Sequence, residues 1–247
     1  MSTDQADKVA GIIIIGNEIL SGTVHDTNSY YLATELRDLG VLVSRIVVIP
    51  DDITVISSTT AEFSKTFDYV FTTGGVGPTH DDMTMEGIAR GFSVNLVPHP
   101  ELEAFFSMRY GDGANESVLK MTKVPEGASV ITHKDMSYPV ITFRNVFILP
   151  GIPEYLREKF SFIKENFRSA AFHVKRFYLD TREMDIAEIL TRTADEHGDV
   201  LFGSYPILDN PEYKIVVTAE SKSENALNVA VDDFTRRLPR AVIVKLD

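Results

Sequence analysis

Short runs of β-branched and aliphatic residues alternate with amphipathic stretches over the first 170 residues of the chain. The apolar runs cover residues 9–15, 41–49, 69–72, 140–143 and 146–149. Near-continuous apolar runs of this length are typical of strands that are buried on both faces of a parallel sheet. We therefore predict that these five runs are strands of one mostly parallel sheet.

The stretches between the runs have the periodicity of helices. Residues 28–39 place Tyr31, Leu32, Leu36 and Leu39 on one side, and Gly40 follows at the position where helices end. Residues 53–66 and 82–92 show similar patterns, and Gly91 closes the second of them. Alternating strands and helices imply right-handed crossovers and a doubly wound α/β fold.

The tail of the chain has a different rhythm, which begins near residue 173. Strands are predicted at residues 175–180, 200–205, 213–219 and 241–245, and helices at residues 183–197 and 224–237. The resulting order is βαββαβ, the split βαβ arrangement. We therefore predict an α/β domain over residues 1–172 and a small α+β domain, similar to ferredoxin-like or KH folds, over residues 173–247.

Charge narrows the choice of partner. The 247 residues include 36 acidic and 24 basic side chains, which gives a net charge of −12, and no Lys/Arg run offsets it locally. This balance repels a nucleic-acid backbone, so we expect no nucleic-acid partner. A small anionic ligand is still compatible, because backbone N–H groups and a metal ion hold phosphate regardless of net charge.

Cysteine, a signal-peptide pattern and a long apolar run are all missing from the sequence, and these absences bear on the compartment that we expect. There is no cysteine, which excludes disulfides, thiolate zinc sites and a cysteine nucleophile. The first eight residues are polar, and the longest apolar run, residues 12–15, is far shorter than the roughly 20 residues of a membrane span. We expect a cytoplasmic protein without membrane contact.

The strongest chemical signal is the segment TTGGVGPTHDDMT at residues 72–84, between a predicted strand and a predicted helix. Three glycines within four positions allow positive φ and a close approach to a ligand. We expect a helix that begins near Asp81 to add unpaired N–H groups and its positive dipole end. The segment therefore predicts a phosphate-binding loop at the carboxyl edge of the sheet.

The same loop carries acidic residues. Thr79 and Asp82 fit a capping box, so a purely structural turn is the alternative interpretation. Asp81 and Asp82 would repel phosphate unless a divalent cation lies between them and the ligand. His80 lies inside the loop and is a candidate acid or base.

A second group of candidates follows the first strand. Glu18 comes directly after the buried run, at the same sheet edge as the glycine loop, and a carboxylate there costs desolvation unless it is exposed or used. Asp26, Thr27 or Asn28 begins the next helix, where N-capping is the simple interpretation. A third segment, LPGIP at residues 149–153, fits helix initiation by Pro153, and FGSYP at residues 202–206 is a weaker signal.

Three motifs together carry a family resemblance. They are GNEIL with DTN five residues later, TTGGVGPTHDDMT and LPGIP, in this order. The chain resembles the molybdopterin-binding-like domain of the competence/damage-inducible protein A family, including the N-terminal domain of eukaryotic FAD synthases. The resemblance implies a three-layer α/β/α core like that of molybdopterin adenylyltransferases, in a homo-oligomer such as a dimer or trimer.

The resemblance also implies which chemistry to expect. Those adenylyltransferases have a GGTG loop and an Arg-Asp-x-Thr-like segment, which Asp82 and Thr84 match, whereas Asp81 replaces the basic residue and Val76 the threonine. This departure matches the branch associated with metal-dependent cleavage of pyrophosphates such as ADP-ribose or FAD. Neither the FAD-making module nor the C-terminal amidase of these families has a counterpart in the 247 residues, so we expect neither activity.

The sequence thus leads to a hypothesis with two alternatives. We predict a nucleotide pyrophosphatase that uses Mg²⁺, Mn²⁺ or Co²⁺, with K⁺ as a further candidate, and that releases AMP. The metal ligands are Asp81, Asp82 and Glu18, and the catalytic residues are Asp82, Asp81 and His80. Candidate ligand-binding residues are Gly74, Gly75, Val76, Gly77, Pro78, Thr79, Thr84, Gly16, Asn17, Asn28, Pro150 and Gly151. The alternatives are a pterin-binding or adenylyl-transferring protein of molybdenum cofactor synthesis, and a non-catalytic regulatory module.

Overall fold

The computed structural model describes residues 8–111 and 115–247 of the chain. They form two compact units, one that ends at Ser169 and one from Ala170 to Asp247. This division lies three residues before the predicted domain boundary at residues 172 and 173. No helix in the described ranges is long and apolar enough to cross a membrane.

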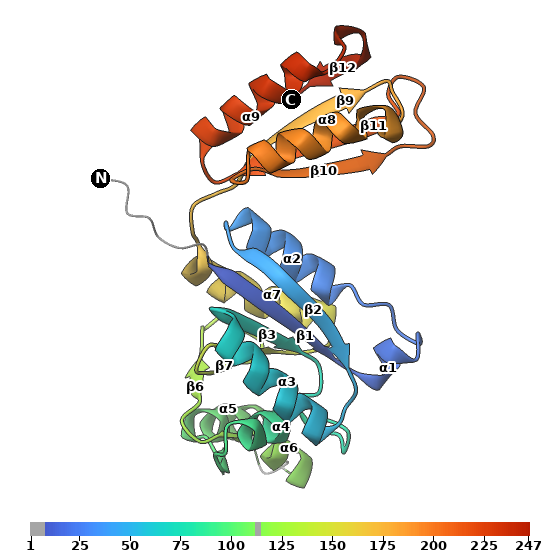
Figure 1. The fold of residues 1–247 in the computed structure, drawn as a ribbon. Coiled ribbons are helices and arrows are strands. Elements are labelled where there is room, and N and C mark those ends of the chain that lie inside the picture. The colour runs from blue at the N-terminus through green and yellow to red at the C-terminus, as the bar shows by residue number, and fades with distance from the viewer. Residues whose placement is uncertain (1–7, 112–114) are drawn as a thin grey trace, which may run out of the picture. The chain divides into compact units, whose positions relative to one another are not determined.

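A six-stranded mixed sheet forms the centre of the first unit (Figure 1). Its strand order is β2-β1-β3-β8-β7-β6, in which β2, β1, β3 and β8 are parallel and β7 and β6 are antiparallel to their neighbours. The strands are β1 (Val9–Ile15), β2 (Leu42–Ile49), β3 (Tyr69–Thr73), β6 (Ser129–Ile131), β7 (Val140–Phe143) and β8 (Val146–Leu149). The five predicted strands are confirmed within one residue at each end.

Helices cover both faces of this sheet. They are α1 (Asn17–Leu20), α2 (Asn28–Asp38), α3 (Ile53–Thr66), α4 (Thr84–Gly91) and α7 (Pro153–Ile163), and α7 continues into the 3₁₀ helix η2 (Lys164–Phe167). Alternate residues of β1 point to opposite cores: Ile12 and Ile14 pack with α2 and α7, and Ile13 and Ile15 with α3 and α4. The predicted three-layer α/β/α arrangement is confirmed.

One expectation about the strands is wrong. We predicted burial on both faces for all the runs, but Ser44, Arg45 and Ile46 of β2 are exposed. The reason is that β2 lies at one edge of the sheet, where β1 is its one partner among the described strands. Charge on an edge strand also opposes pairing with another chain, and Arg45 bonds to Glu62 at 2.6 Å.

The part of the unit between α4 and β7 was not predicted. It contains β4 (Leu96–Pro98), α5 (Pro100–Tyr110), α6 (Glu116–Lys120), β5 (Lys123–Pro125) and the strand β6. These elements pack around their own small core of Leu102, Phe106, Val118 and Val124. Four of the five elements have five residues or fewer, which is too short for a clear periodicity.

The second unit confirms the predicted βαββαβ order. Its elements are β9 (His173–Leu179), α8 (Glu183–Glu196), β10 (Leu201–Pro206), β11 (Ile215–Ser221), α9 (Glu224–Arg237), the 3₁₀ helix η3 (Arg240–Val242) and β12 (Ile243–Leu246). The sheet is antiparallel with the order β10-β11-β9-β12. Phe177, Val217 and Phe234 lie in its buried core. The FGSYP segment, residues 202–206, forms most of strand β10, which pairs with β11.

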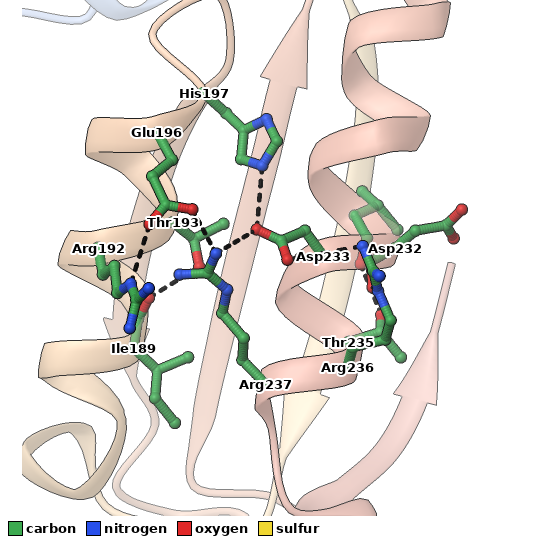
Figure 2. Close-up of polar contacts among 11 residues, drawn as sticks. Ile189, Arg192, Thr193, Glu196, His197, Asp232, Asp233, Thr235, Arg236 and Arg237 are labelled. Carbon is green, nitrogen blue, oxygen red and sulfur yellow. Dashed lines mark hydrogen bonds and ion pairs between the residues drawn. The ribbon is translucent and has the colours of Figure 1, made fainter.

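A charged network joins the two helices of the second unit (Figure 2). Asp233 of α9 accepts hydrogen bonds from His197 at 3.1 Å and Arg237 at 2.8 Å. Arg237 also pairs with Glu196 of α8, which is held by Arg192 one helical turn earlier at 2.9 Å. The network links α8 to α9 through charged side chains of both helices.

Candidate functional site

A cavity of about 600 Å³ opens at the carboxyl ends of three neighbouring parallel strands. Glu18 follows β1, the loop Gly74–Pro78 follows β3, and Pro150 and Gly151 follow β8, and all of them line this cavity. Ligands of open α/β sheets bind at this edge. The three sequence motifs therefore meet in one place, as their positions after the strands predict.

The glycine loop depends on residues without a side chain. Gly74 has φ +102° and Gly75 has φ +62°, which L-residues with side chains rarely adopt. A Cβ atom on Gly74 would lie 2.0 Å from the carbonyl oxygen of Ile15 in β1. Gly77 does not have a positive φ, so our expectation of three such glycines holds for two of them.

The amides of the loop are not all available to a ligand. Gly74 N donates to Leu149 O at 3.2 Å and so extends the sheet. The amides of Gly75, Val76 and Gly77 donate to no acceptor in the described part of the chain. The anion-binding surface that we predicted over residues 74–77 is therefore reduced to three consecutive N–H groups.

The helix after the loop begins later than predicted. We expected a start near Asp81, but α4 begins at Thr84. Thr84 N donates to Gly75 O at 3.0 Å, and its buried hydroxyl donates to Gly74 O at 2.8 Å. Thr84 therefore does not line the cavity but fixes the two glycines from behind, and this corrects its assignment as a ligand-binding residue.

The Thr79 side chain contacts both aspartates of the loop, Asp81 and Asp82. Its hydroxyl lies 2.5 Å from an oxygen of Asp81 and 2.5 Å from an oxygen of Asp82, and its amide donates to Asp82 at 2.7 Å. The bond from the Thr79 hydroxyl lowers the pKa of Asp81. The bond from the Thr79 amide to Asp82 matches one half of a capping box, but the turn precedes α4 and does not cap it. Lys120 of α6 also donates to Thr79 O.

Within residues 78–82, Pro78 and Asp82 line the cavity, and Thr79, His80 and Asp81 do not. The Asp81 side chain is 60% exposed, and that of His80 is 97% exposed and lies 3.9 Å from Asp81. The structure thus places Asp82 at the cavity, and Asp81 and His80 outside it.

Glu18 enters the cavity from the short helix α1. Its carboxylate packs against Gly16, where a Cβ atom would meet Glu18 Oε1 at 2.6 Å. The helix is anchored to the strand ends, because Asn17 N donates to the carboxylate of Asp51, which follows β2, at 2.8 Å. Gly16 is buried and Asn17 is exposed, and neither lines the cavity. The bond from Asn17 N to Asp51 holds the start of the helix that carries Glu18.

Asn28 at the start of α2 is a buried brace. Its amide nitrogen donates to Thr73 Oγ1 at 3.0 Å and to Gly151 O at 2.7 Å, and Thr73 donates to Pro150 O at 2.9 Å. These bonds tie the end of β3 to the turn after β8. Asn28 holds the cavity wall formed by Pro150 and Gly151 and does not line the cavity itself.

The predicted set of three carboxylate ligands does not gather around one point. In residues 8–111 and 115–247, no group of three His, Asp or Glu side chains could hold a metal ion. Glu18 and Asp82 line the cavity, whereas Asp81 lies outside it. Two carboxylates fit a magnesium-type ion, which proteins commonly bind through one or two carboxylates together with substrate phosphates.

An aromatic wall that lines the same cavity was not predicted. Phe106 and Tyr110 of α5 line it together with Tyr138 and with Tyr155 of α7. Phe106 stacks on Tyr110 with ring centroids 6.1 Å apart, and Tyr138 meets Tyr155 edge-on at 5.7 Å. Such a wall accepts a flat heterocycle by stacking.

A buried lysine was also missed. Lys159 lies on α7, is 8% exposed and lines the cavity. Its ammonium donates to Pro139 O at 2.6 Å. One signal in the sequence marks it, since residues 156, 159, 160 and 163 follow the i, i+3, i+4, i+7 spacing of a buried helix face.

Comparison with known proteins gives two family matches that follow the two units. Residues 11–170 match the family described as "Probable molybdopterin binding domain". Residues 171–247 match the family described as "FAD synthase, middle domain".

Individual relatives agree with these matches. A protein of Archaeoglobus fulgidus is 35% identical over 92% of this chain and 96% of its own length. A "Probable FAD synthase" of Caenorhabditis elegans is 32% identical over 96% of this chain, which spans 51% of that protein. Among solved structures, the protein CinA of Thermoplasma acidophilum, titled as having unknown function, has 30% identity and a TM-score of 0.60 over 66% of this chain and 100% of its own.

Proposed function

The chain belongs to the family of probable molybdopterin-binding domains, and on that premise we propose that it is a metal-dependent nucleotide pyrophosphatase. Its substrate is a dinucleotide-like diphosphate such as FAD or ADP-ribose, and one product is AMP. The observation that carries the proposal is that unpaired loop amides and two carboxylates, Glu18 and Asp82, line the same cavity. Relatives named as FAD synthases support a nucleotide as the ligand.

In this proposal the glycine loop, residues 74–77, binds the diphosphate. The amides of Gly75, Val76 and Gly77 have no acceptor in the described chain and are free to donate to phosphate oxygens. Hydrogen bonds from these amides require no rearrangement, because Thr84 and Leu149 already fix the loop backbone. The aromatic wall of Phe106, Tyr110, Tyr138 and Tyr155 then takes the flat base.

Because the cavity carboxylates and the diphosphate are all negatively charged, binding of the diphosphate requires a cation between them. Glu18 and Asp82 would repel a bound diphosphate, and the chain as a whole carries a net charge of −12. A divalent ion held by these carboxylates and the phosphate oxygens would neutralise the repulsion and lower the pKa of a bound water. The residues that the structure describes offer too few ligands for a tight site, so we propose that metal and nucleotide bind together.

Hydrolysis breaks the bond between one phosphorus and the bridging oxygen of the anhydride. A water oxygen bonds to that phosphorus, and its proton passes to one of the two cavity carboxylates, because His80 does not reach the cavity. FAD would give AMP and FMN, and ADP-ribose would give AMP and ribose 5-phosphate.

The test is product analysis. The protein is incubated with FAD, ADP-ribose and NAD in the presence of Mg²⁺, Mn²⁺ or Co²⁺, with K⁺ present or absent, and the products are separated. Release of AMP with at least one metal supports the proposal. No cleavage with any pair of substrate and metal would contradict it.

A second candidate is favoured by the family description. Molybdopterin combines a pterin, which is a heterocycle, with a phosphate, so the same cavity would accept a molybdopterin-like ligand. Against it stands Asp81 at the position where the resembled adenylyltransferases carry a basic residue. Co-purification of a pterin, or transfer of a nucleotide onto one, would favour this candidate, whereas binding without turnover would favour a regulatory module.

A further inference from the structure

Lys159 is a basic residue on the buried face of helix α7, where the neighbouring side chains are apolar. On α7 it shares the buried face with Leu156, Phe160 and Ile163, which are fully buried. Lys159 itself is 8% exposed, and it lines the cavity. Among the described residues that line the cavity, it has the one basic side chain.

The hydrogen bonding of this ammonium is incomplete. A lysine ammonium has three N–H donors. In the described chain, Lys159 Nζ donates one hydrogen bond, to Pro139 O at 2.6 Å, and forms no ion pair. A buried charge without a counter-charge is costly, so an anion in the cavity would satisfy both the spare donors and the charge.

The neighbouring groups do not supply that counter-charge. Glu158 precedes Lys159 on α7, but its carboxylate accepts from Ser137 N at 2.9 Å and from Ser137 Oγ at 2.8 Å. Burial lowers the pKa of Lys159 to about 8, although the nearby Glu158 acts in the opposite direction. Tyr110, Tyr138 and Tyr155 are titratable side chains that also line the cavity, and the hydrogen bond with Tyr110 raises the pKa of Tyr138.

We propose that Lys159 is a binding residue for an anionic phosphate oxygen of the nucleotide in the cavity. The inference rests on the proposed function in taking a nucleotide phosphate as the ligand, but it does not require that the ligand be hydrolysed. It divides the recognition of phosphate between loop amides on one side and a buried cation on α7. The glycine loop binds through neutral dipoles, and Lys159 supplies the positive charge that the acidic cavity otherwise lacks.

The test is calorimetric titration at pH 8 with Mg²⁺ and two probes, AMP and the uncharged adenosine. In Lys159→Met, the affinity for AMP is expected to fall by about tenfold to a hundredfold, as for a lost hydrogen bond to a charged group, while the affinity for adenosine stays the same. An equal loss for both probes would mean that Lys159 only maintains the fold, and would overturn the proposal.

A second readout concerns protons and uses the wild-type protein itself. A phosphate beside Lys159 would raise its pKa, so AMP binding at pH 8 should take up protons, to a limit of about half a proton per site. Titrations in buffers of different ionisation enthalpy measure this uptake, and adenosine should cause none. AMP-linked proton uptake that is the same in Lys159→Met as in wild type would overturn the proposal.

These measurements separate the inference from the proposed function. If no diphosphate is cleaved but AMP binding depends on Lys159 in both readouts, the pyrophosphatase proposal fails and the binding residue stands. If AMP is released from ADP-ribose while Lys159→Met binds AMP as wild type does, the proposed function stands and the inference fails.

Discussion

The carboxylate of Asp82 packs so closely against Gly77 that a Cβ atom on Gly77 would lie 2.7 Å from Asp82 Oδ2. Glu18 has the same relationship to Gly16, at 2.6 Å. Both acidic side chains that line the cavity are thus directed by a neighbouring glycine. The absence of a side chain at these two glycines therefore leaves the space that the neighbouring carboxylate occupies.

This relationship predicts the effect of Gly77→Ala. The new methyl group would displace the Asp82 carboxylate, and a displacement of about 1 Å can cost on the order of a hundredfold in turnover. Because Gly77 does not have a positive φ, the fold should tolerate alanine. AMP release and thermal unfolding are the two measurements. Gly198→Ala is the matched control, since no atom lies within 4 Å of its Cβ position. Normal turnover in Gly77→Ala would show that the contact has no functional role.

Asp82→Asn tests the carboxylate itself. It keeps the size of the side chain and removes the charge, so metal-dependent turnover should fall by about a hundredfold or more while the fold is retained. Asp81→Asn and His80→Ala are the controls, and both should keep most of the activity because neither residue lines the cavity. A well-folded Asp82→Asn protein with undiminished AMP release would refute the assignment.

Metal binding provides a prediction that does not depend on turnover. The cavity offers two carboxylates, and phosphate oxygens would complete the ligand set, so Mn²⁺ should bind weakly to the free protein and more tightly with a nucleotide. Electron paramagnetic resonance of Mn²⁺ with and without AMP measures the difference. Equal Mn²⁺ affinity in both conditions would indicate a site made by the protein alone or no site at all.

The sequence predicted the strands and the place of the site because both depend on local pattern. The buried run of β1 and the loop after β3 could be located from apolar runs and glycines, and parallel strands bring their carboxyl ends to one edge. What could not be predicted is the direction of each polar side chain. Thr84 and Asn28 lie in the motifs, yet their side chains are buried and hold backbone carbonyls.

The presence of the aromatic wall and of Lys159 in the cavity was not predicted, for a different reason. The wall comes from α5, α7 and the segment before β7, which contact only through tertiary packing. The helical spacing of Lys159 with Leu156, Phe160 and Ile163 was its one signal in the sequence, but a lysine in an amphipathic helix is usually solvated. Its place on the buried face becomes significant only when Leu156 and Phe160 are known to be in the core.

Stability should depend on Asn28 more than on its exposed neighbours. Asn28→Ala removes two buried hydrogen bonds, to Thr73 and Gly151, and leaves carbonyl and hydroxyl groups without their donor. The expected loss is about 1–3 kcal/mol of unfolding free energy. Urea unfolding followed by circular dichroism measures it. Asn17→Ala is the control, because the described chain gives the exposed Asn17 side chain no hydrogen bond. Equal midpoints for the two variants would contradict the role of Asn28 as a brace.

The network between α8 and α9 predicts how the second unit responds to acid. Burial would raise the pKa of Asp233, but hydrogen bonds from His197 and Arg237 outweigh it and lower the pKa below its ordinary 3.8. Arg237 and Arg192 likewise lower the pKa of Glu196 below 4.5. Because folding favours the ionised carboxylates, their contribution is complete at neutral pH and is lost as the pH falls below about 4.

Asp233→Asn should therefore lower the melting temperature at pH 7, and the difference from wild type should shrink as the pH approaches 3. Thermal unfolding of both proteins across this pH range measures the difference. Asp232→Asn is the matched control, since the neighbouring carboxylate forms no hydrogen bond or ion pair in the described chain and should give a small difference at every pH. A melting-temperature difference for Asp233→Asn that stays constant from pH 7 to pH 3 would mean that the variant disturbs packing, and that the charge of Asp233 does not hold the two helices together.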